Sequence, residues 1–352
     1  MRGIYVHIPF CERKCPYCSF NSYHGQEKLI YDYVKRAILE IRSYPRERVD
    51  TVYFGGGTPT FLPAEETEKL LFAAREHFYL ENESEITIEA NPGTSDTQKL
   101  VQLKNSGFNR ISIGVQSFNA DELLALGRVH TPTCAENAVM RAWDAGFKNI
   151  SADIMFGTPG QTIKSLGHTL DKMLSLPVSH ISAYSLSVDE GTRFYEMRDT
   201  LKLADEDTER QMYRTIIKRL GDEGFRHYEI SNFAKDGFYS RHNTKYWTGE
   251  EYIGIGAGAH SYYKNERYGN ICGIKEYIGS ADPSADREFI DGAEREREYY
   301  ILGLRLLEGV LDRGHPAVDT LVGDGLLERC GGNIRLTERG LDLANYVLAK
   351  FM

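Results

Sequence analysis

The chain has 352 residues, of which 41% are hydrophobic and 26% are charged, a composition typical of globular proteins. Its formal net charge of −9 argues against a general surface for nucleic acid or anionic membranes. The N-terminus lacks the pattern of a signal peptide, and no apolar stretch reaches the roughly 18 residues of a membrane span, so we expect a cytoplasmic protein with reduced cysteines.

Six short apolar runs, each followed by a helix-like pattern, divide the first part of the chain. Nearly continuous apolar runs are typical of parallel strands that are covered on both faces. Between them we expect amphipathic helices, for example one from Pro63 and one with Ser95 as its N-cap. This order predicts an α/β fold, either doubly wound or a barrel, with its chemistry at the carboxyl ends of the strands. The runs are residues 3–10, 50–57, 85–92, 110–117, 149–157 and 180–188.

The pattern changes after about residue 225, and three segments are expected: 1–225, 226–284 and 285–352. Ten aromatic residues fall between positions 228 and 268. The last segment predicts a helix at 295–310, a second at 320–328, a hairpin at 330–337 and a final helix, an order that resembles a winged helix. Its 13 acidic against 9 basic residues disfavour DNA binding and favour a docking or lid role.

Three of the six cysteines, Cys11, Cys15 and Cys18, fall within the stretch CERKCPYC. Thiolates this close together indicate a bound metal ion or cluster, because their mutual repulsion must be offset by cationic metal. A structural zinc ion would need a fourth ligand, for which His7 or His24 is available. A four-iron cube held by three cysteines would instead keep one iron open for a further ligand.

The spacing C-x-x-x-C-x-x-C after a first strand resembles the signature of the radical S-adenosylmethionine (SAM) superfamily. The resemblance implies a 4Fe-4S cluster held by the three cysteines, with SAM chelated at the open iron. It also implies one-electron cleavage of SAM to a 5′-deoxyadenosyl radical, fed by an unidentified electron donor. The fold it implies is an open six-unit (β/α) partial barrel with a small α+β, winged-helix-like C-terminal domain.

Further motifs in YFGGGTPT, IEANP, GVQSF, LGRVH and ADIMFGTPGQT extend this resemblance. Taken singly, such motifs are more often a tight turn, a helix cap or a solvated charge. Their order at successive strand ends favours the superfamily. The resemblance assigns SAM binding to Tyr5, Tyr17, Gly56, Gly57, Thr58, Glu89, Gln116, Arg128 and Asp153.

The sequences of these motifs are similar to those of oxygen-independent coproporphyrinogen III oxidases and HemW-like heme chaperones. Phe20 stands where the oxidases carry a further cysteine, and RHNTKYW contains the H-N-x-x-Y-W motif of the heme chaperones. The resemblance therefore implies heme binding by His242, Tyr246 and Trp247, with His260 as a second candidate iron ligand. The ordinary alternative is that His242 caps a turn beside core aromatics.

The resemblance therefore implies a heme chaperone that binds a 4Fe-4S cluster, SAM and heme and delivers heme to acceptor proteins such as respiratory hemoproteins. Peripheral membrane contact would suit such delivery. The alternative is an oxidase that decarboxylates the propionates of coproporphyrinogen III. In either case Cys134, Cys272 and Cys330 are expected to be dispensable for the cluster.

Overall fold

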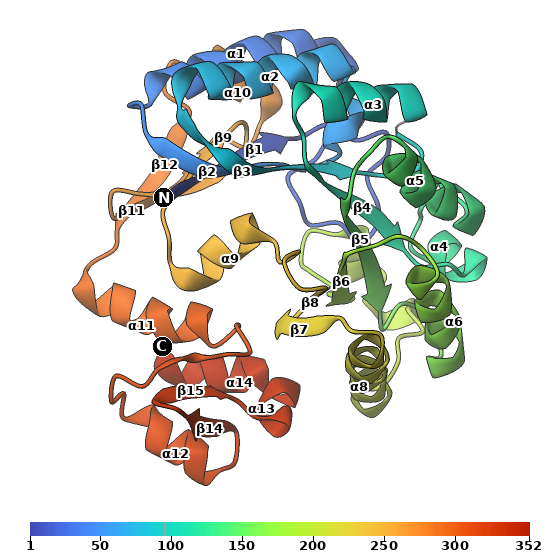
Figure 1. The fold of residues 1–352 in the computed structure, drawn as a ribbon, viewed down its shortest axis with the longest axis vertical. Coiled ribbons are helices and arrows are strands. Elements are labelled where there is room, and N and C mark those ends of the chain that lie inside the picture. The colour runs from blue at the N-terminus through green and yellow to red at the C-terminus, as the bar shows by residue number, and fades with distance from the viewer. Residues whose placement is uncertain (95) are drawn as a thin grey trace.

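The structure, a computed structural model, describes residues 1–94 and 96–352 and is built on one 12-stranded sheet in the order β12-β11-β10-β9-β1-β2-β3-β4-β5-β6-β8-β7 (Figure 1). Its centre is a set of parallel strands in chain order, which confirms the predicted α/β fold. These strands are β1 Arg2–Ile8, β2 Arg48–Gly56, β3 Tyr79–Ala90, β4 Arg110–Gln116, β5 Asn149–Phe156 and β6 His180–Ser185.

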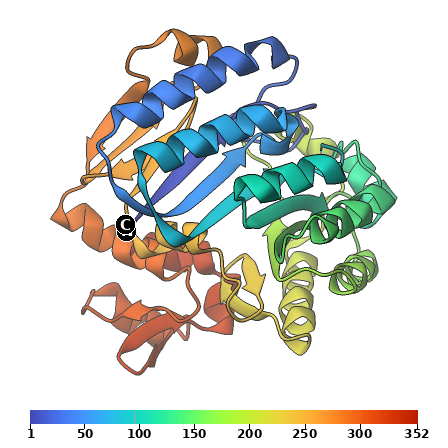
Figure 2. The ribbon, with the colours of Figure 1, turned by 45° about the horizontal axis from the view of Figure 1, so that its top comes forward.

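Helices connect these strands and cover the outer face of the sheet, where α1, α2 and α3 lie side by side (Figure 2). In α1 the buried residues Tyr33, Val34, Ala37 and Ile41 recur at helical spacing, so one stripe of the helix faces the sheet. The helices are α1 Ile30–Ser43, α2 Ala64–His77, α3 Thr97–Ser106, α4 Ala120–Ala125, α5 Pro132–Asp144, α6 Ile163–Leu174, α7 Arg193–Glu196 and α8 Glu206–Asp222. The predicted N-cap Ser95 lies outside the described residues; Asp96 caps α3 by accepting the Lys99 N–H at 2.8 Å.

The segment after α8 extends the parallel set at both edges. β9 pairs in parallel with β1 and continues into the antiparallel β10, β11 and β12, while β8 and β7 add an antiparallel edge beside β6. Phe233 and Ile253 join the same hydrophobic core as the first six strands. The elements are β7 Arg226–Glu229, β8 Asn232–Ala234, β9 Tyr252–Ile255, β10 His260–Tyr263, β11 Glu266–Asn270, α10 Ile274–Gly279 and β12 Ser284–Phe289.

Helix α9, Arg241–Thr248, lies on the concave side of the sheet, near the amino ends of the strands (Figure 1). The main-chain N–H of His242 donates to Glu85 Oε1 at 3.0 Å, and Lys245 Nζ pairs with Asp50 Oδ1 at 2.9 Å. A carboxylate at the start of a helix also satisfies its unpaired N–H groups. α9 thus closes the end of the barrel opposite the carboxyl ends of the strands.

The C-terminal unit has its own core, built around Tyr300, Leu304 and Phe351, and a small antiparallel sheet in the order β13-β15-β14. This confirms the small α+β unit. The predicted helix 295–310 was too long, because α11 ends at Gly303. Gly309 turns the chain with φ +71°, and the position requires glycine because a Cβ there would lie 1.9 Å from the Ile334 carbonyl oxygen. Its elements are α11 Gly292–Gly303, β13 Val310–Leu311, α12 Ala317–Gly323, β14 Leu327–Cys330, β15 Asn333–Leu336, α13 Glu338–Asp342 and α14 Ala344–Leu348.

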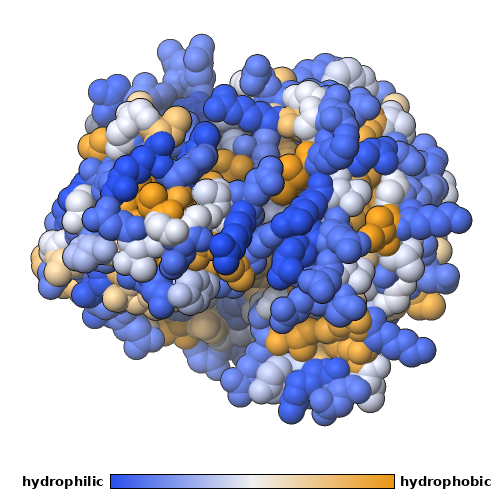
Figure 3. Space-filling view, turned by 90° about the horizontal axis from the view of Figure 1, so that it is seen from below, coloured by the Kyte–Doolittle hydropathy of each residue, from blue (hydrophilic) through white to orange (hydrophobic). Residues whose placement is uncertain are grey.

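Seen from below, the surface is mainly hydrophilic, with apolar side chains in small separate groups (Figure 3). Over the residues that the structure describes, none of the helices combines the length and the apolar character that crossing a membrane requires.

Candidate functional site

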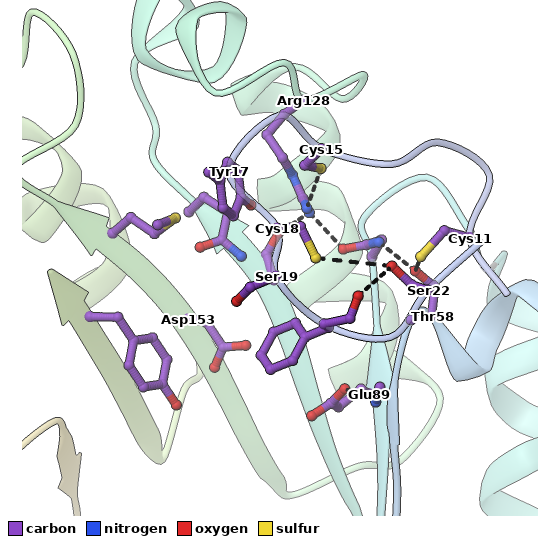
Figure 4. Close-up of a pocket in the computed structure, with 18 of the residues that line it drawn as sticks. Cys11, Cys15, Tyr17, Cys18, Ser19, Ser22, Thr58, Glu89, Arg128 and Asp153 are labelled. Atoms are coloured by element: carbon purple, nitrogen blue, oxygen red, sulfur yellow. Dashed lines mark hydrogen bonds between the residues drawn. The ribbon is translucent and has the colours of Figure 1, made fainter. Parts of the chain in front are cut away.

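A cavity of about 300 Å³ opens at the carboxyl ends of the parallel strands (Figure 4). Its volume lies at the lower end of the range for small-molecule sites, roughly 300–1,000 Å³. It is lined by all three clustered cysteines and by every residue predicted to bind SAM except Tyr5. These residues are Cys11, Cys15, Tyr17, Cys18, Gly56, Gly57, Thr58, Glu89, Gln116, Arg128 and Asp153.

The loop that carries the cysteines follows directly on β1 and is closed at its base by main-chain hydrogen bonds. The N–H of Cys11 donates to the Tyr23 carbonyl at 2.9 Å, and the N–H of Tyr23 donates to the Pro9 carbonyl at 2.7 Å. A further bond of 3.1 Å from the Cys18 N–H to the Cys15 carbonyl forms a turn. The three thiols are therefore fixed on one short loop around one end of the cavity (Figure 4).

Each thiol has a polar neighbour. Cys11 Sγ lies 3.5 Å from Thr58 Oγ1, and Cys18 Sγ lies 4.0 Å from Ser22 Oγ. Cys15 Sγ accepts from Arg128 Nη1 at 3.6 Å. Burial raises the pKa of the Cys11 thiol, against the hydrogen bond from Thr58, so a cationic partner is needed to hold this residue as a thiolate.

The two histidines considered as zinc ligands are not placed for that role. His7 is buried, with Nε2–H donating to the Asn21 carbonyl at 2.7 Å and Nδ1 accepting from the Tyr5 hydroxyl at 3.1 Å. His24 is exposed. Among the residues described, no three His, Cys, Asp or Glu side chains converge on one ion position. The donor set fits a larger cluster with three thiolate ligands better than a closed site for a single ion.

The glycine loop after β2 packs tightly against the cysteine loop. Gly56 has φ +109°, and a Cβ there would lie 2.4 Å from the His7 ring. A Cβ on Gly57 would lie 2.7 Å from the Phe10 carbonyl oxygen and 3.0 Å from Cys11 Sγ. Only glycine permits this approach, which brings Thr58 to Cys11. The space beside the glycine loop and the cysteine loop therefore fits a cluster and its ligand on the predicted residues.

Two carboxyl groups enter the cavity from β3 and β5, which flank β4. Glu89 Oε1 accepts from the Tyr53 hydroxyl at 2.7 Å and Oε2 accepts from the Gly56 N–H at 3.1 Å. Asp153 Oδ1 accepts from Ser112 Oγ at 3.1 Å. Burial raises the pKa of Glu89 to about 7, helped by the charge of Asp153, and it raises the pKa of Asp153 to about 6. Carboxyl groups in this setting favour a ligand that donates hydrogen bonds or carries positive charge.

A short hydrogen-bond chain fixes Arg128. Its Nη2 donates to Asn91 Oδ1 at 2.6 Å and to the Gly114 carbonyl at 2.8 Å, while Asn91 Nδ2 donates to Thr58 Oγ1 at 2.7 Å. Gln116 has φ +67°, a strained conformation for a non-glycine residue and one that occurs at functional sites. Asn91 was not predicted individually, although its position at the end of a strand beside Glu89 was a usable signal.

Sequence reasoning also missed the side of the cavity formed by the end of β6 and the residues that follow it. Tyr184, Ser185, Ser187 and Asp189 line it there, because β6 ends at Ser185 and not near residue 188. Polar residues after an apolar run were the available signal. Phe20 lies at the rim and is 67% exposed. Cys134, Cys272 and Cys330 lie outside the cavity.

Tyr5 lies beneath the cavity. Its ring stacks on the Tyr53 ring with centroids 6.1 Å apart, and its hydroxyl contacts His7. It therefore does not line the cavity itself but contacts Tyr53, which bonds Glu89, and His7, which packs against Gly56.

The structure places the predicted heme-binding residues at the other end of the barrel. His242 is 1% exposed; Nδ1 lies 2.9 Å from Thr51 Oγ1 and Nε2 lies 2.9 Å from the Tyr246 hydroxyl. Burial lowers the pKa of His242 to about 3. Ligation of iron by His242 would require this ring to leave a hydroxyl partner.

Trp247 and His260 are more accessible than His242. Trp247 lines a cavity of about 430 Å³ between α9, α11 and the C-terminal sheet, and Arg305 Cζ lies 4.4 Å from the centroid of its ring. His260 is exposed at the start of β10, close to the loop that joins β10 to β9. A ligand reaches these side chains without prior rearrangement of their surroundings.

Comparisons with known proteins agree with this geometry. The Radical SAM superfamily profile matches residues 5–173. "Heme chaperone HemW" of Bacillus subtilis (strain 168) is 38% identical, over 100% of this chain and 99% of its own length. "Heme chaperone HemW" of Escherichia coli (strain K12) is 31% identical over 99% of this chain and 98% of its own. The structure of coproporphyrinogen III oxidase (HemN) from Escherichia coli superposes with a TM-score of 0.86 at 22% identity, over 99% of this chain and 90% of that one, which shows a shared fold.

Proposed function

The chain belongs to the radical SAM superfamily, among the relatives of the heme chaperone HemW, and on that premise we propose that it binds a 4Fe-4S cluster, SAM and heme and transfers heme to acceptor hemoproteins. The family implies the cluster and SAM, and the name of its relatives implies heme. Cytoplasmic location, an electron donor for the cluster and acceptors among the respiratory hemoproteins are part of the proposal.

One observation carries it: a single cavity brings three thiols on one loop together with the polar groups of the strand ends. Cys11, Cys15 and Cys18 would hold three corners of a cube, so the remaining iron has no thiolate from this group. When bound, the cluster supplies one-electron reduction to SAM.

The residues of the chain would bind and orient SAM. Arg128 presents a guanidinium, which pairs a carboxylate bidentately, beside Cys15. Gly56, Gly57 and Thr58 lie beside Cys11, where the resemblance places the amino group of SAM. Glu89 offers carboxylate oxygens that remain able to accept from sugar hydroxyls.

Heme binding is proposed at the aromatic segment that carries the H-N-x-x-Y-W motif. Trp247 offers a flat apolar surface at a cavity that Arg295 and Arg313 also line, so that a cation would be at hand to pair a propionate. His242 and His260 are the two candidate iron ligands.

The test combines three measurements on one anaerobically reconstituted sample. We expect about four iron and four sulfide per chain, a shift of the Soret band on titration with hemin, and no protoporphyrinogen from coproporphyrinogen III with SAM and reductant. Colourless protein with one zinc ion would contradict the cluster. Accumulation of protoporphyrinogen would replace the chaperone by the oxidase.

The iron ligand is identified by comparing His242→Ala and His260→Ala in the hemin titration, with His24→Ala as the control. His24 is exposed and lies outside both cavities, so its variant should titrate like the wild type. The variant that loses the Soret shift identifies the ligand. A shift unchanged in both variants would remove both histidines from the proposal.

A further inference from the structure

A cluster of three stacked rings connects α9 to the floor of the cavity at the opposite end of the barrel. The His242 ring stacks on Tyr53, with centroids 5.1 Å apart and an interplanar angle of 27°. Tyr5 stacks on both rings, with its centroid 6.1 Å from that of Tyr53 and 6.4 Å from that of His242. The Tyr53 hydroxyl donates to Glu89 Oε1 at 2.7 Å, and Glu89 lines the cavity. The ring cluster therefore links the predicted heme-binding motif to a predicted SAM contact.

The direction of the Tyr53 hydroxyl is set by the rings that pack against it. A tyrosine hydroxyl lies on the axis of its ring, so a tilt of the ring moves it. Tyr53 is 8% exposed, and the rings of Tyr5 and His242 both pack on it and on each other. A Cβ on Gly55 would lie 2.9 Å from Tyr53 and 3.0 Å from Tyr5, so the space above these rings is also filled. Removing the His242 ring would free one face of Tyr53.

His242 is itself held firmly enough to act as a support. Thr51 and Tyr246 each contact one of its ring nitrogens at 2.9 Å, and its main-chain N–H donates to Glu85 at 3.0 Å. A residue anchored from both its main chain and its side chain transmits its position to whatever packs on it.

We propose that His242 is a positioning residue for the SAM pocket: by holding the Tyr53 ring, it keeps the Glu89 carboxylate oriented into the cavity. The inference rests on the proposed function, because it takes Glu89 as a contact of SAM. It goes beyond that function by giving the histidine of the H-N-x-x-Y-W motif a role in SAM binding that does not require heme.

The chain offers a matched control in His180. This histidine is also fully buried inside the barrel, with Nδ1 2.7 Å from Ser151 Oγ and Nε2 2.9 Å from the Tyr228 hydroxyl. It packs on Tyr228 and has no contact with the cavity. His180→Ala therefore reproduces the loss of a buried imidazole between two hydroxyl groups without disturbing the ring cluster.

The experiment measures the dissociation constant of SAM by equilibrium dialysis on the anaerobically reconstituted full chain. Iron content and melting temperature are measured on the same samples. His242→Ala and Tyr53→Phe should weaken SAM binding about tenfold, the order expected when one hydrogen bond to a charged acceptor is lost. His242→Phe restores a ring against Tyr53 and should return the affinity to within about twofold of the wild type. His180→Ala should also stay within about twofold.

Rescue by His242→Phe separates packing from iron ligation, because phenylalanine cannot bind iron. Wild-type SAM affinity in His242→Ala, with full iron content, would overturn the inference. Equal weakening in His180→Ala would overturn it as well, because the effect would then be general loss of stability. If His242→Ala does not fold, Tyr53→Phe decides: wild-type affinity in that variant contradicts the inference. Absence of SAM binding in the wild type would overturn the proposed function itself, and this inference with it.

Discussion

The two ends of the barrel present their functional residues in different ways. At the carboxyl ends of the strands, the cysteine loop and the side chains of Glu89, Arg128 and Asp153 face one cavity. At the amino ends, His242 and Tyr246 of α9 face inward and are joined by a hydrogen bond. The first end is a preformed ligand site. The second is a packed floor. The H-N-x-x-Y-W motif, which is predicted to bind heme, can therefore also support the site at the other end of the barrel.

The largest expected effect tests the carboxyl end. Cys11→Ala, Cys15→Ala or Cys18→Ala should each lower the iron content from about four per chain to nearly none, because two thiolates do not hold the cube against solvent. Iron and sulfide analysis after anaerobic reconstitution measures this.

Cys272→Ala is the control for this prediction, because Cys272 is exposed and lies outside the cavity. If it lost iron while one of the three loop variants kept it, the assignment of the cluster to this end of the barrel would be wrong.

The pH dependence of stability sharpens the comparison, because Glu89 is a buried carboxyl of the preformed site. Its pKa rises from 4.5 to about 7 in the folded protein, so its stabilising contribution is complete below about pH 4.5 and is lost as the pH rises through 7. In the absence of SAM, the free energy of unfolding of Glu89→Gln should rise by about 3 kcal/mol relative to that of the wild type between pH 4.5 and about pH 8. Chemical denaturation at both pH values measures the difference.

A constant difference for Glu89→Gln would mean that the Glu89 carboxyl is not desolvated.

At the amino end, His242→Ala should lower the free energy of unfolding by about 2–3 kcal/mol. It leaves a cavity and deprives Thr51 and Tyr246 of their buried partner. His24→Ala, at an exposed position, should change it by less than about 0.5 kcal/mol. Equal effects in denaturant titrations would contradict the description of α9 as a packed floor.

The smallest expected effect concerns the geometry of one side chain at the carboxyl end. Arg128→Lys keeps the charge but loses the planar fork that contacts Asn91 and Gly114, and it should weaken SAM binding about tenfold. Arg141→Lys, on α5 and away from the cavity, should bind SAM like the wild type. Equal dissociation constants for the two variants would remove Arg128 from the site.

The carboxyl end could be predicted from sequence because parallel strands bring their ends to one edge of the sheet. Cys11, Gly57 and Glu89 are far apart in the chain, but Cys11 and Gly57 follow strands and Glu89 is next to the last residue of β3. Depth along a strand was harder to judge. Tyr5 and Asp153 each lie three residues before the end of their strands, yet only Asp153 lines the cavity.

The orientation of α9 could not be predicted, because it depends on partners distant in sequence. His242 contacts Thr51 and Glu85, and nothing in the sequence near His242 indicates them. The end of α11 has a similar cause: the apolar pattern continues beyond Gly303, and Gly309 is required by the carbonyl group of Ile334 in a later strand.

The central claim is that the three thiols seat a cluster whose open iron takes SAM in the cavity at the carboxyl ends. Electron–nuclear double resonance on the reduced cluster, with SAM labelled at the methionine amino nitrogen and carboxylate oxygen, tests it most directly. We predict hyperfine coupling from both labels in the wild type, with the carboxylate coupling altered in Arg128→Lys. A reduced cluster whose spectrum shows neither coupling when saturating SAM is present would contradict the account.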